Sequence, residues 1–441
     1  MKIVQAMGGY YPDTLGGTEV YVAGLSRRLR AAGLEVLVAA PDAAGGQERS
    51  YDHDGILVYR YPIPAAPTRS ECQGLVSARG AERFHAWLAR HRPDVVHFHA
   101  FVTGLGLGEI RAAKAAGARV IVTTHSSSLG WICQRGTMMR WGKKICDGIC
   151  EPAKCAACEL QHRGLPKSLA RSIGRIPTMI SRVSRSLPGK LGTALSMSDL
   201  IVRNLMMQRE MLATVDKFVL LTQWALDIVA ANGAPRAKLA LNPLGVSQTK
   251  ITPKPSPEDR PTRLPITVGY LGRFETIKGV HDLARAVAGL PRGLPIRVEF
   301  RGPVNGAGVR ACVGELRALV RDDGRVAFAP PVAHREALEI LAGYDVLCCP
   351  AVCAEGGPTA AVEAHAVGTP VIGTRIGGLA ELVTDGVNGR LVEPGDWRAL
   401  AGVLSQMATE PARTIDRWRS ALPPARTMDE IAADYLALYS A

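Results

Sequence analysis

The sequence predicts an α/β protein built from two Rossmann-like domains. Its length of 441 residues is sufficient for two or three domains. Short apolar segments alternate with helical patterns throughout the chain, which is typical of parallel sheets. A polar, proline-rich stretch near the middle has turn residues and no hydrophobic period, as expected of a linker. Hydrophobic residues make up 47% of the chain, which is enough for a buried core on either side of that stretch.

Strands are expected on both sides of the linker. They are predicted at 2–7, 34–40, 56–61, 94–98, 118–124 and 217–222 in the first half, and at 266–271, 296–301, 325–328, 345–349, 370–374 and 390–392 in the second. The first domain is therefore assigned to 1–245, the linker to 246–265 and the second domain to 266–425. A last helix is expected over 427–439.

A glycine-rich loop follows the first predicted strand. Gly16 and Gly17 come directly before a helix that is expected to end near Ala32. A strand, a glycine loop and a helix in this order favour binding of an anion at the helix start. The spaced glycine pattern of a dinucleotide site is absent, so that kind of site is only weakly indicated.

Two histidines follow predicted strands of the first domain. His99 comes after the strand 94–98, and His125 comes after the strand 118–124. Residues just beyond the carboxyl ends of parallel strands line the ligand crevice in open α/β sheets. Both histidines are therefore candidate site residues, and a purely structural histidine is the alternative for each.

Basic residues follow the first strand of the second domain. Gly272 and Arg273 come after the strand 266–271, and Lys278 comes shortly before the next helix. Arginine presents a planar fork of N–H donors to phosphate oxygens, and lysine adds a mobile point charge. These residues suit a phosphate site, whereas a solvated basic loop is the alternative.

The segment 355–363 reads EGGPTAAVE. Gly356 and Gly357 have no side chain, so their backbone can approach a bulky anion. Pro358 suits the first helical position, where its missing N–H costs nothing. A helix beginning near Thr359 would direct its positive end at a phosphate held over the glycines.

The same segment carries two carboxylates. Glu355 precedes the predicted helix, and Glu363 lies more than one turn inside it, on a face that otherwise reads as core. Carboxylates accept hydrogen bonds from paired hydroxyls such as those of ribose and other sugars. Two glutamates at a chance spacing are the alternative, and an acid/base pair is not indicated.

Three segments of the second half together resemble the retaining glycosyltransferases of family 4. They are 266–280, 355–363 and 365–396. The resemblance implies the GT-B architecture, in which two Rossmann-like domains face each other across a cleft. It also implies transfer of a sugar from a nucleoside diphosphate donor to an acceptor hydroxyl. The donor site that it implies consists of Gly17, Gly272, Arg273, Lys278, Glu355, Gly356, Gly357, Pro358, Thr359 and Glu363.

The resemblance also suggests what individual residues do. The catalytic candidates are His125, Glu355, Arg273 and Lys278. The two basic residues would stabilise the leaving diphosphate, Glu355 and His125 would contact the transferred sugar, and Glu363 would bind the ribose diol. Gly16, Gly17 and His99 would lie on the acceptor side or in the cleft. No catalytic metal is expected, and the C-terminal segment 426–441 is expected to pack on the first domain.

The chain departs from the family pattern after His125, where an insertion is expected at about 131–198. Clustered cysteines in a reducing compartment favour a metal site over disulfides. The tightest set, which would hold structural zinc, is Cys146, Cys150, Cys155 and Cys158, with Cys133 as a substitute. An iron–sulfur cluster uses the same ligands, and cysteines that bind no metal are the third alternative.

The second half of the insertion is basic and apolar. Between Leu160 and Ser198 there are seven Lys or Arg residues and no Asp or Glu, in a chain whose net charge is +13. Interleaved apolar residues suit contact with an anionic membrane surface or with a polyprenyl diphosphate carrier, and a solvated basic loop is an equal alternative. Nucleic acid is not expected as a partner, because aromatic residues for base stacking are absent from this segment.

These observations predict a retaining enzyme that transfers a hexose-type sugar to a glycan or lipid-linked acceptor. Polysaccharide, glycolipid or lipid-linked oligosaccharide biosynthesis would use such a reaction. A nucleotide-sugar epimerase or a phosphorylase on the same fold is one alternative. An inactive transferase scaffold that serves as a metal-stabilised binding module is another. The sequence shows no signal peptide or membrane span, so the protein is expected to be cytoplasmic, with a peripheral position at the inner face of the membrane. The oligomeric state is left open.

Overall fold

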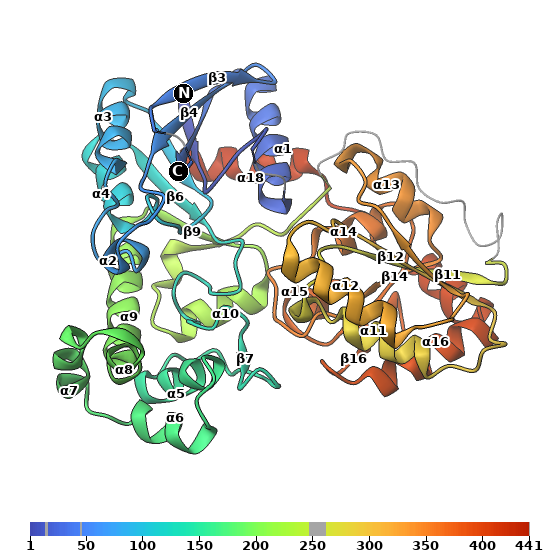
Figure 1. Cartoon of the computed structure of the whole chain (residues 1–441). Coiled ribbons are helices and arrows are strands. Elements are labelled where there is room, and N and C mark those ends of the chain that lie inside the picture. The colour runs from blue at the N-terminus through green and yellow to red at the C-terminus, as the bar shows by residue number, and fades with distance from the viewer. Residues whose placement is uncertain (14–15, 45, 247–261, 441) are drawn as a thin grey trace. The chain divides into compact units, whose positions relative to one another are not determined.

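The computed structural model describes residues 1–13, 16–44, 46–246 and 262–440 (Figure 1). Most of the predicted linker, 247–261, lies outside the described residues. The chain divides into two compact units. Unit 1 comprises Met1–Gly136, Asp147–Pro243 and Met428–Ala441, and unit 2 comprises Thr137–Cys146 and Leu244–Thr427.

The described part of unit 1 contains an eight-stranded sheet in the order β10-β9-β6-β5-β1-β2-β4-β3. Its strands are β1 (Lys2–Ala6), β2 (Glu35–Asp42), β3 (Arg49–His53), β4 (Ile56–Pro62), β5 (Val95–Phe98), β6 (Arg119–Thr123), β9 (Lys217–Leu220) and β10 (Leu239–Leu241). Among these described strands, all neighbouring pairs are parallel except that of the edge strand β3 with β4. β1 lies between β2 and β5, so Ile3 is in register with Val36 on one side and Val95 on the other.

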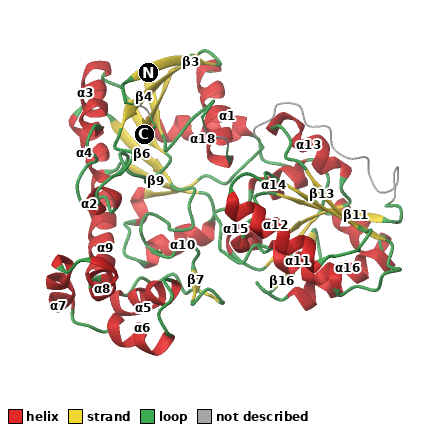
Figure 2. Ribbon diagram, viewed as in Figure 1, coloured by secondary structure: helices red, strands yellow, loops and turns green. Residues whose placement is uncertain are grey.

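Helices pack on both faces of this sheet (Figure 2). They are α1 (Gly17–Ala31), α2 (Arg69–Cys72), α3 (Ala81–His91), α4 (Leu107–Ala115), α9 (Met197–Thr214), α10 (Gln223–Ala231) and α18 (Met428–Ser440). α1 buries Val22, Leu25 and Leu29, which recur at the three- and four-residue spacing of one helical face. α18 ends the described chain and packs against α1, where Tyr21 Oη donates to Tyr435 Oη at 3.1 Å.

The insertion of unit 1 is helical. It comprises α5 (Pro152–His162), α6 (Lys167–Gly174), α7 (Thr178–Val183), a 3-10 turn η1 (Ser184–Ser186) and α8 (Gly189–Leu195), and it leads into α9. Its own small core joins Ala156 and Leu160 of α5 to Leu200 and Ile201 of α9. α6 lies so close to α5 that a Cβ on Gly174 would come 2.8 Å from the Ala153 carbonyl oxygen. None of the described helices is long and apolar enough to cross a membrane.

The described part of unit 2 contains a six-stranded parallel sheet in the order β13-β12-β11-β14-β15-β16. The strands are β11 (Ile266–Leu271), β12 (Ile296–Arg301), β13 (Val326–Ala329), β14 (Val346–Cys349), β15 (Val371–Thr374) and β16 (Gly389–Val392). Fully buried Val268, Val298 and Val346 from neighbouring strands help to form the core. The predicted α/β class with parallel sheets is confirmed in both units.

Helices cover both faces of the second sheet as well. They are α11 (Val280–Ala288), α12 (Ala307–Leu319), α13 (His334–Gly343), α14 (Thr359–Ala366), α15 (Gly377–Leu382), α16 (Trp397–Thr409) and α17 (Arg417–Ser420), with the short turns η3 (Thr276–Lys278) and η4 (Ala412–Asp416). A two-stranded hairpin of β7 (Met139–Arg140) and β8 (Lys144–Ile145) also belongs to unit 2.

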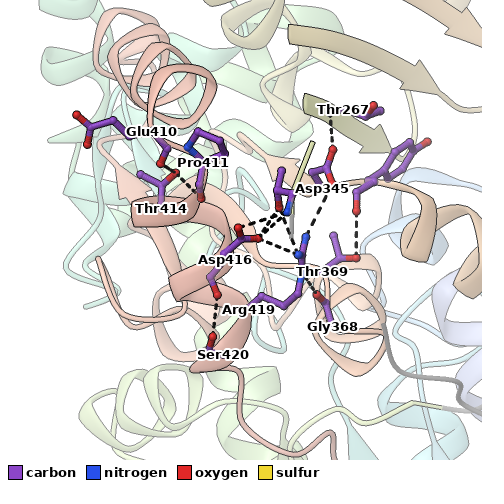
Figure 3. A network of polar contacts seen from close by, with 12 residues as sticks. Thr267, Asp345, Gly368, Thr369, Glu410, Pro411, Thr414, Asp416, Arg419 and Ser420 are labelled. Carbon is purple, nitrogen blue, oxygen red and sulfur yellow. Dashed lines mark hydrogen bonds and ion pairs between the residues drawn. The ribbon is translucent and has the colours of Figure 1, made fainter. Parts of the chain in front are cut away.

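A buried arginine, Arg419, is the centre of a polar network near the last helices of unit 2 (Figure 3). Arg419 of α17 is 9% exposed; it donates to Asp416 at 3.1 Å and to the Gly368 carbonyl oxygen at 3.2 Å. Asp416 also accepts a 2.6 Å bond from Thr262 Oγ1, in the described part of the predicted linker 246–265. Arg419 and Asp416 each have several hydrogen-bond partners, and these bonds offset the free-energy cost of removing the two charges from water. The network joins the start of the unit to its last helices.

Candidate functional site

The strand order of unit 2 places a ligand site between β11 and β14. From β11 the chain proceeds outward to β12 and β13, and it then returns to the other side of β11 to form β14, β15 and β16. In open parallel sheets, ligands bind beyond the carboxyl ends of the strands at such a reversal of order. The loops that leave β11 and β14 carry the donor residues predicted for this domain.

An ion pair joins these two loops. Lys278, at the end of η3, contacts Glu355 Oε1 through its Nζ, although the two residues lie 77 positions apart. Both side chains are about one-fifth exposed, at 22% and 21%, so solvent and ligands can reach them. Cys353 Sγ lies 3.7 Å from the same carboxylate oxygen and donates to it. A cation and a carboxylate are thus held side by side, where one can contact phosphate and the other sugar hydroxyls.

Glycines hold the backbone around this pair. Gly279 follows Lys278 with φ +69°, and a Cβ there would lie only 1.7 Å from the Pro350 carbonyl oxygen after β14. Gly377 has φ +55°, and its Cβ would lie 2.6 Å from the Glu355 carbonyl oxygen. Gly378 donates its N–H to that oxygen at 2.8 Å. Close approach of backbone to backbone therefore fixes both loops, and glycine alone permits it.

Gly377 and Gly378 were not predicted as site residues. They lie within a segment that resembles the family, but no role in the site was expected for them. The feature that could have indicated them is a glycine pair two residues after a predicted strand, at the start of a helix. Such a pair indicates a close backbone approach, although the sequence does not show which segment is approached.

Arg273 lies at the same edge of the sheet but has a different partner. Its guanidinium donates to Glu275 at 2.7 Å and its side chain is 64% exposed. Its main chain is fixed, because Tyr270 Oη donates to the Arg273 carbonyl oxygen at 2.6 Å. Gly272 is equally confined, since a Cβ on Gly302 of the neighbouring loop would lie 2.0 Å from the Gly272 carbonyl oxygen. Arg273 is thus an exposed, mobile cation on a rigid support.

α14 begins at Thr359, as predicted, but Pro358 is its N-cap residue and not its first helical residue. The expected position of Pro358 was wrong by one residue, which is within the usual uncertainty of helix ends. Proline has no side-chain acceptor, so it does not cap the first helical N–H groups. Gly357 precedes it with φ +124°, a conformation that glycine tolerates. The positive end of α14 therefore follows the Glu355 loop without a side-chain cap.

Glu363 lies in the second turn of α14 and is 4% exposed. Burial raises the pKa of this carboxyl to about 7. A buried carboxyl with a raised pKa is costly for the fold, and such groups concentrate at functional sites. The same helix buries His365, whose pKa burial lowers to about 4.

Glu363→Gln is expected to stabilise the protein at neutral and alkaline pH. The pKa of Glu363 rises from 4.5 in the unfolded chain to about 7 in the folded one, so the folded state binds the proton more tightly. Stability from this group is complete below pH 4.5 and is lost as pH rises to 7. Glutamine mimics the protonated form, so the variant should gain roughly 3 kcal/mol over the parent above pH 7, and almost nothing below pH 4.5.

Urea unfolding of both proteins at pH 4.5, 6 and 8 measures this difference. His365 contributes the opposite slope in both, because its lowered pKa favours folding as pH rises, and it therefore cancels in the comparison. Glu410→Gln, at an exposed position after α16, is the control and should show no such pH dependence. A gain from Glu363→Gln that does not change with pH would contradict the buried carboxyl.

Unit 1 has a corresponding reversal of strand order, between β1 and β5. His99 follows β5, and its Nε2 lies 2.7 Å from Gln5 Oε1 of β1. Its Nδ1 lies 3.2 Å from Nε2 of His125, which follows β6. The structure thus brings the two predicted histidines into direct contact.

These contacts specify how the histidines are protonated. Burial lowers the pKa of His99 well below its usual range and that of His125 to about 4, so both are neutral at physiological pH. With Gln5 Oε1 as acceptor, His99 carries its hydrogen on Nε2 and accepts on Nδ1 from His125. His125 then keeps a free electron pair on Nδ1.

A third histidine and two tyrosines of α18 support this pair. His97 of β5 is fully buried, and its Nδ1 lies 2.7 Å from Tyr439 Oη. Its Nε2 lies 2.7 Å from Thr123 Oγ1, which is itself 2.8 Å from Tyr435 Oη. Neither these residues nor Gln5 were predicted from the sequence. Gln5, His97 and Thr123 are polar side chains inside otherwise apolar strands, and that pattern could have indicated them.

Gly16 and Gly17 lie at the start of α1. Gly16 is its N-cap residue, in an extended conformation, and Gly17 is its first residue. A Cβ on Gly16 would come 2.7 Å from a Glu19 carboxylate oxygen. Residues 14–15 of the same loop lie outside the described residues.

The described part of the structure does not show the predicted four-cysteine metal site. Cys146 belongs to the hairpin segment of unit 2, whereas Cys150, Cys155 and Cys158 belong to unit 1. Among the described residues, no group of three or more histidine, cysteine, aspartate or glutamate side chains is arranged to hold a metal ion. Cys150 instead donates to Cys155, and this bond lowers the pKa of the Cys155 thiol while that of Cys150 is raised. The substitute Cys133 does not complete a ligand set either. We therefore assign no role to zinc or to an iron–sulfur cluster.

Family models match both halves of the chain. The description "Glycosyl transferase 4-like domain" covers residues 16–149, and "Glycosyl transferases group 1" covers residues 265–410. The chain belongs to the family 4 glycosyltransferases. The second match includes Lys278, Glu355 and Glu363, and the first includes the histidine pair.

Curated relatives and solved structures agree with this family. The D-inositol 3-phosphate glycosyltransferase of Xylanimonas cellulosilytica is 27% identical over 449 residues, covering 96% of this glycosyltransferase and 91% of the relative. The enzyme of that name from Streptomyces avermitilis is 27% identical and covers 92% and 78%.

Among solved structures, sucrose-phosphate synthase from Thermosynechococcus elongatus has a TM-score of 0.67 at 19% identity, covering 100% and 98% of the two chains. Anabaena HepE in complex with UDP-glucose has a TM-score of 0.63 at 16% identity, covering 100% and 99%. At these identities the structures show the fold alone. The predicted GT-B class is confirmed.

Proposed function

We propose that this glycosyltransferase moves a hexose-type sugar from a nucleoside diphosphate donor to an acceptor hydroxyl, with retention of configuration. The observation that carries the proposal is the ion pair of Lys278 and Glu355 at the strand reversal of unit 2, in the loop before α14. A phosphate-binding cation, a sugar-binding carboxylate and a helix start meet there. The expected acceptor is a glycan or a lipid-linked sugar.

In this proposal, positive charge in unit 2 drives the departure of the donor diphosphate. Lys278 and the first N–H groups of α14 stabilise the negative charge that develops on the leaving oxygen, and the exposed Arg273 can exchange its Glu275 partner for the diphosphate. Removing Lys278 from its carboxylate partner costs little, because the pair is partly exposed. A diphosphate can therefore replace Glu355 as the partner of the lysine and leave the carboxylate for sugar hydroxyls.

The remaining residues bind and orient the substrates. Glu363 accepts hydrogen bonds from the ribose diol, which would compensate for the burial of its charge. Neutral His125 offers a hydrogen-bond acceptor on Nδ1 for a hydroxyl of the transferred sugar. Retention then follows from front-face attack, with the leaving phosphate accepting the proton of the acceptor hydroxyl. The family resemblance supports this route.

A panel of donors tests the proposal through thermal unfolding. The panel contains UDP, GDP, UDP-glucose, UDP-galactose and GDP-mannose; UDP-glucose is the first candidate because the HepE structure contains it. At 100 times the dissociation constant, one matching donor should stabilise the fold by about 2.7 kcal/mol, which corresponds to roughly 5 to 10 °C in Tm.

Lys278→Ala should abolish this stabilisation, and uridine or guanosine without phosphates should not produce it. Hydrolysis of the stabilising donor, followed by release of the nucleoside diphosphate, then fixes the reaction type. If no nucleoside diphosphate raises Tm, or if Lys278→Ala responds as the parent does, the proposed donor site is wrong.

A further inference from the structure

The insertion of unit 1 exposes a cluster of large apolar side chains. Met179, Ile180 and Val183 of α7 are 82%, 57% and 75% exposed. Leu187 follows η1 at 42%, and Leu191 of α8 is 65% exposed. We call these five residues the apolar face. α6, α7 and α8 lie beside one another at one end of unit 1 (Figure 1).

The orientation of α7 is the reverse of a normal surface helix. Such a helix buries its apolar side and exposes its polar side. In α7 and the turn after it, the buried side chains are Ser181 and Ser184. Ser181 Oγ accepts from the Asp199 N–H of α9 at 3.0 Å, and Ser184 Oγ donates to the Ile180 carbonyl oxygen at 3.0 Å. The Ser181 bond joins α7 to α9, and the Ser184 bond stays within α7 and its turn, so the polar side of α7 faces inward and Met179 and Val183 face outward.

Small residues make the support of this face rigid. Ala170 and Gly174 of α6 are buried next to α5. Gly192 of α8 lies so close to the preceding turn that a Cβ would collide with the Leu187 carbonyl oxygen. Four of the five apolar residues therefore lie on packed helices, and Leu187 lies in the tight turn between η1 and α8.

Exposed basic residues alternate along the chain with those of the apolar face. Arg175, Arg182, Arg185 and Lys190 are all exposed, and the sequence between 160 and 198 has no acidic residue. Asp199 lies just beyond that range and is buried, where it bonds Arg203 at 2.9 Å and lies 3.6 Å from Arg185. The exposed rim of the face therefore carries positive charge around an apolar centre.

We propose that the apolar face and its basic rim bind the surface of an anionic lipid bilayer. Exposed apolar side chains of this size mark a contact site, since water around them is released when they are covered. In a bilayer they would enter the boundary between headgroups and acyl chains, while the arginines and lysine contact lipid phosphates. The proposal goes beyond the proposed function and does not depend on the donor site.

Charge and composition argue against the other occupants. A two-fold dimer through this face would set its basic rim against an identical basic rim, which repels. A nucleic acid would leave Met179 and Val183 without a partner, and the segment 160–198 has no aromatic side chain for base stacking. A bilayer with acidic headgroups matches the charge and the apolar centre at once.

Sedimentation of the full chain with vesicles tests the proposal. Vesicles of phosphatidylcholine with 30% phosphatidylglycerol are compared with pure phosphatidylcholine. We expect binding to the anionic vesicles that is at least tenfold stronger, and that weakens as salt is raised from roughly 0.05 to 0.5 M. No preference for anionic vesicles would overturn the proposal.

Two pairs of variants separate the apolar and the charged parts. Met179→Gln with Val183→Gln should reduce binding at least tenfold, and Arg175→Gln with Arg182→Gln roughly thirtyfold at low salt. The matched controls are Val76→Gln with Val387→Gln, and Arg310→Gln with Arg413→Gln, at exposed positions elsewhere. The controls should bind as the parent does.

The same variants also show whether the assignment of the apolar face to lipid binding is wrong. All these side chains are exposed, so Tm should stay within about 2 °C of the parent, and binding can be compared between folded proteins. Equal vesicle binding by parent and Met179→Gln with Val183→Gln would overturn the proposal. So would light scattering that shows a dimer for the parent and a monomer for this variant, since the apolar face would then be covered by a second copy of the chain.

Discussion

Lys278→Ala is expected to lower kcat/KM for sugar transfer by about 10²- to 10³-fold, the usual cost of removing one group that stabilises developing negative charge. The diphosphate would lose the cation that the loop after β11 presents beside Glu355. Lys278→Arg should recover part of the rate, because a cation returns at a longer reach. The measurement is initial-rate kinetics with the donor that the thermal-shift panel selects.

The fold should not change in this variant. The lysine and its carboxylate partner are both about one-fifth exposed, so water can solvate Glu355 when Lys278 is removed, and the loss of stability should stay below about 1 kcal/mol. Arg310→Ala, at an exposed basic position on α12, is the control and should keep full activity. Activity of Lys278→Ala within threefold of the parent would show that the lysine does not stabilise the leaving group.

Gly279→Ala is expected to lower the free energy of unfolding by at least about 3 kcal/mol. The left-handed conformation at φ +69° costs a residue with a Cβ about 1 to 2 kcal/mol by itself. In addition, the new Cβ would lie 1.7 Å from the Pro350 carbonyl oxygen and 2.5 Å from its carbon, both backbone atoms that can yield only if a loop moves. Urea unfolding, followed by circular dichroism, measures the loss.

Gly314→Ala is the control, and it is expected to raise the free energy of unfolding. Gly314 lies inside α12, and no atom outside its own helix backbone lies within 4 Å of the place that a Cβ would take, so alanine should stabilise the helix by roughly 0.5 to 1 kcal/mol. Equal unfolding free energies for Gly279→Ala and the parent would mean that the loops after β11 and β14 are not held together by this approach.

The strands that carry both sheets were predictable because they are short apolar runs between turn residues. β11 (Ile266–Leu271) and β12 (Ile296–Arg301) have the predicted bounds. β3 was not predicted, because its sequence Arg-Ser-Tyr-Asp-His is polar and it forms an edge strand with mostly exposed residues. β10 was missed because only three residues form it. Pairing with a neighbour, and not local preference, defines such strands.

The candidate site was predictable in its residues but not in its geometry. The loop chemistry indicated Lys278 and Glu355 separately, as a phosphate ligand and a sugar ligand. Their contact depends on β11 lying beside β14, and that order is a property of the whole sheet. The contact between His99 and His125 depends in the same way on β5 lying beside β6.

The metal site predicted from the cysteines is not shown by the described residues, and its geometry could not be read from the sequence for a related reason. Spacing along the chain limits how far apart sulfur atoms can be, but it does not make them converge. The backbone between Cys133 and Cys150 passes through the hairpin of β7 and β8, which belongs to unit 2, and Cys146 is at the end of that segment.

The place of α18 in unit 1 has a consequence for synthesis of the protein. Tyr435 and Tyr439, which contact Thr123 and His97, are made only after the whole of residues 244–427. At ribosomal rates this interval lasts roughly 10 to 40 seconds. Throughout it, the nascent first unit lacks the helix that packs against α1, and His97 lacks its Tyr439 partner, whereas unit 2 is assembled mainly from the segment being made. The second unit can therefore complete its core first, whereas the amino-terminal unit can complete its own only after the last helix has emerged.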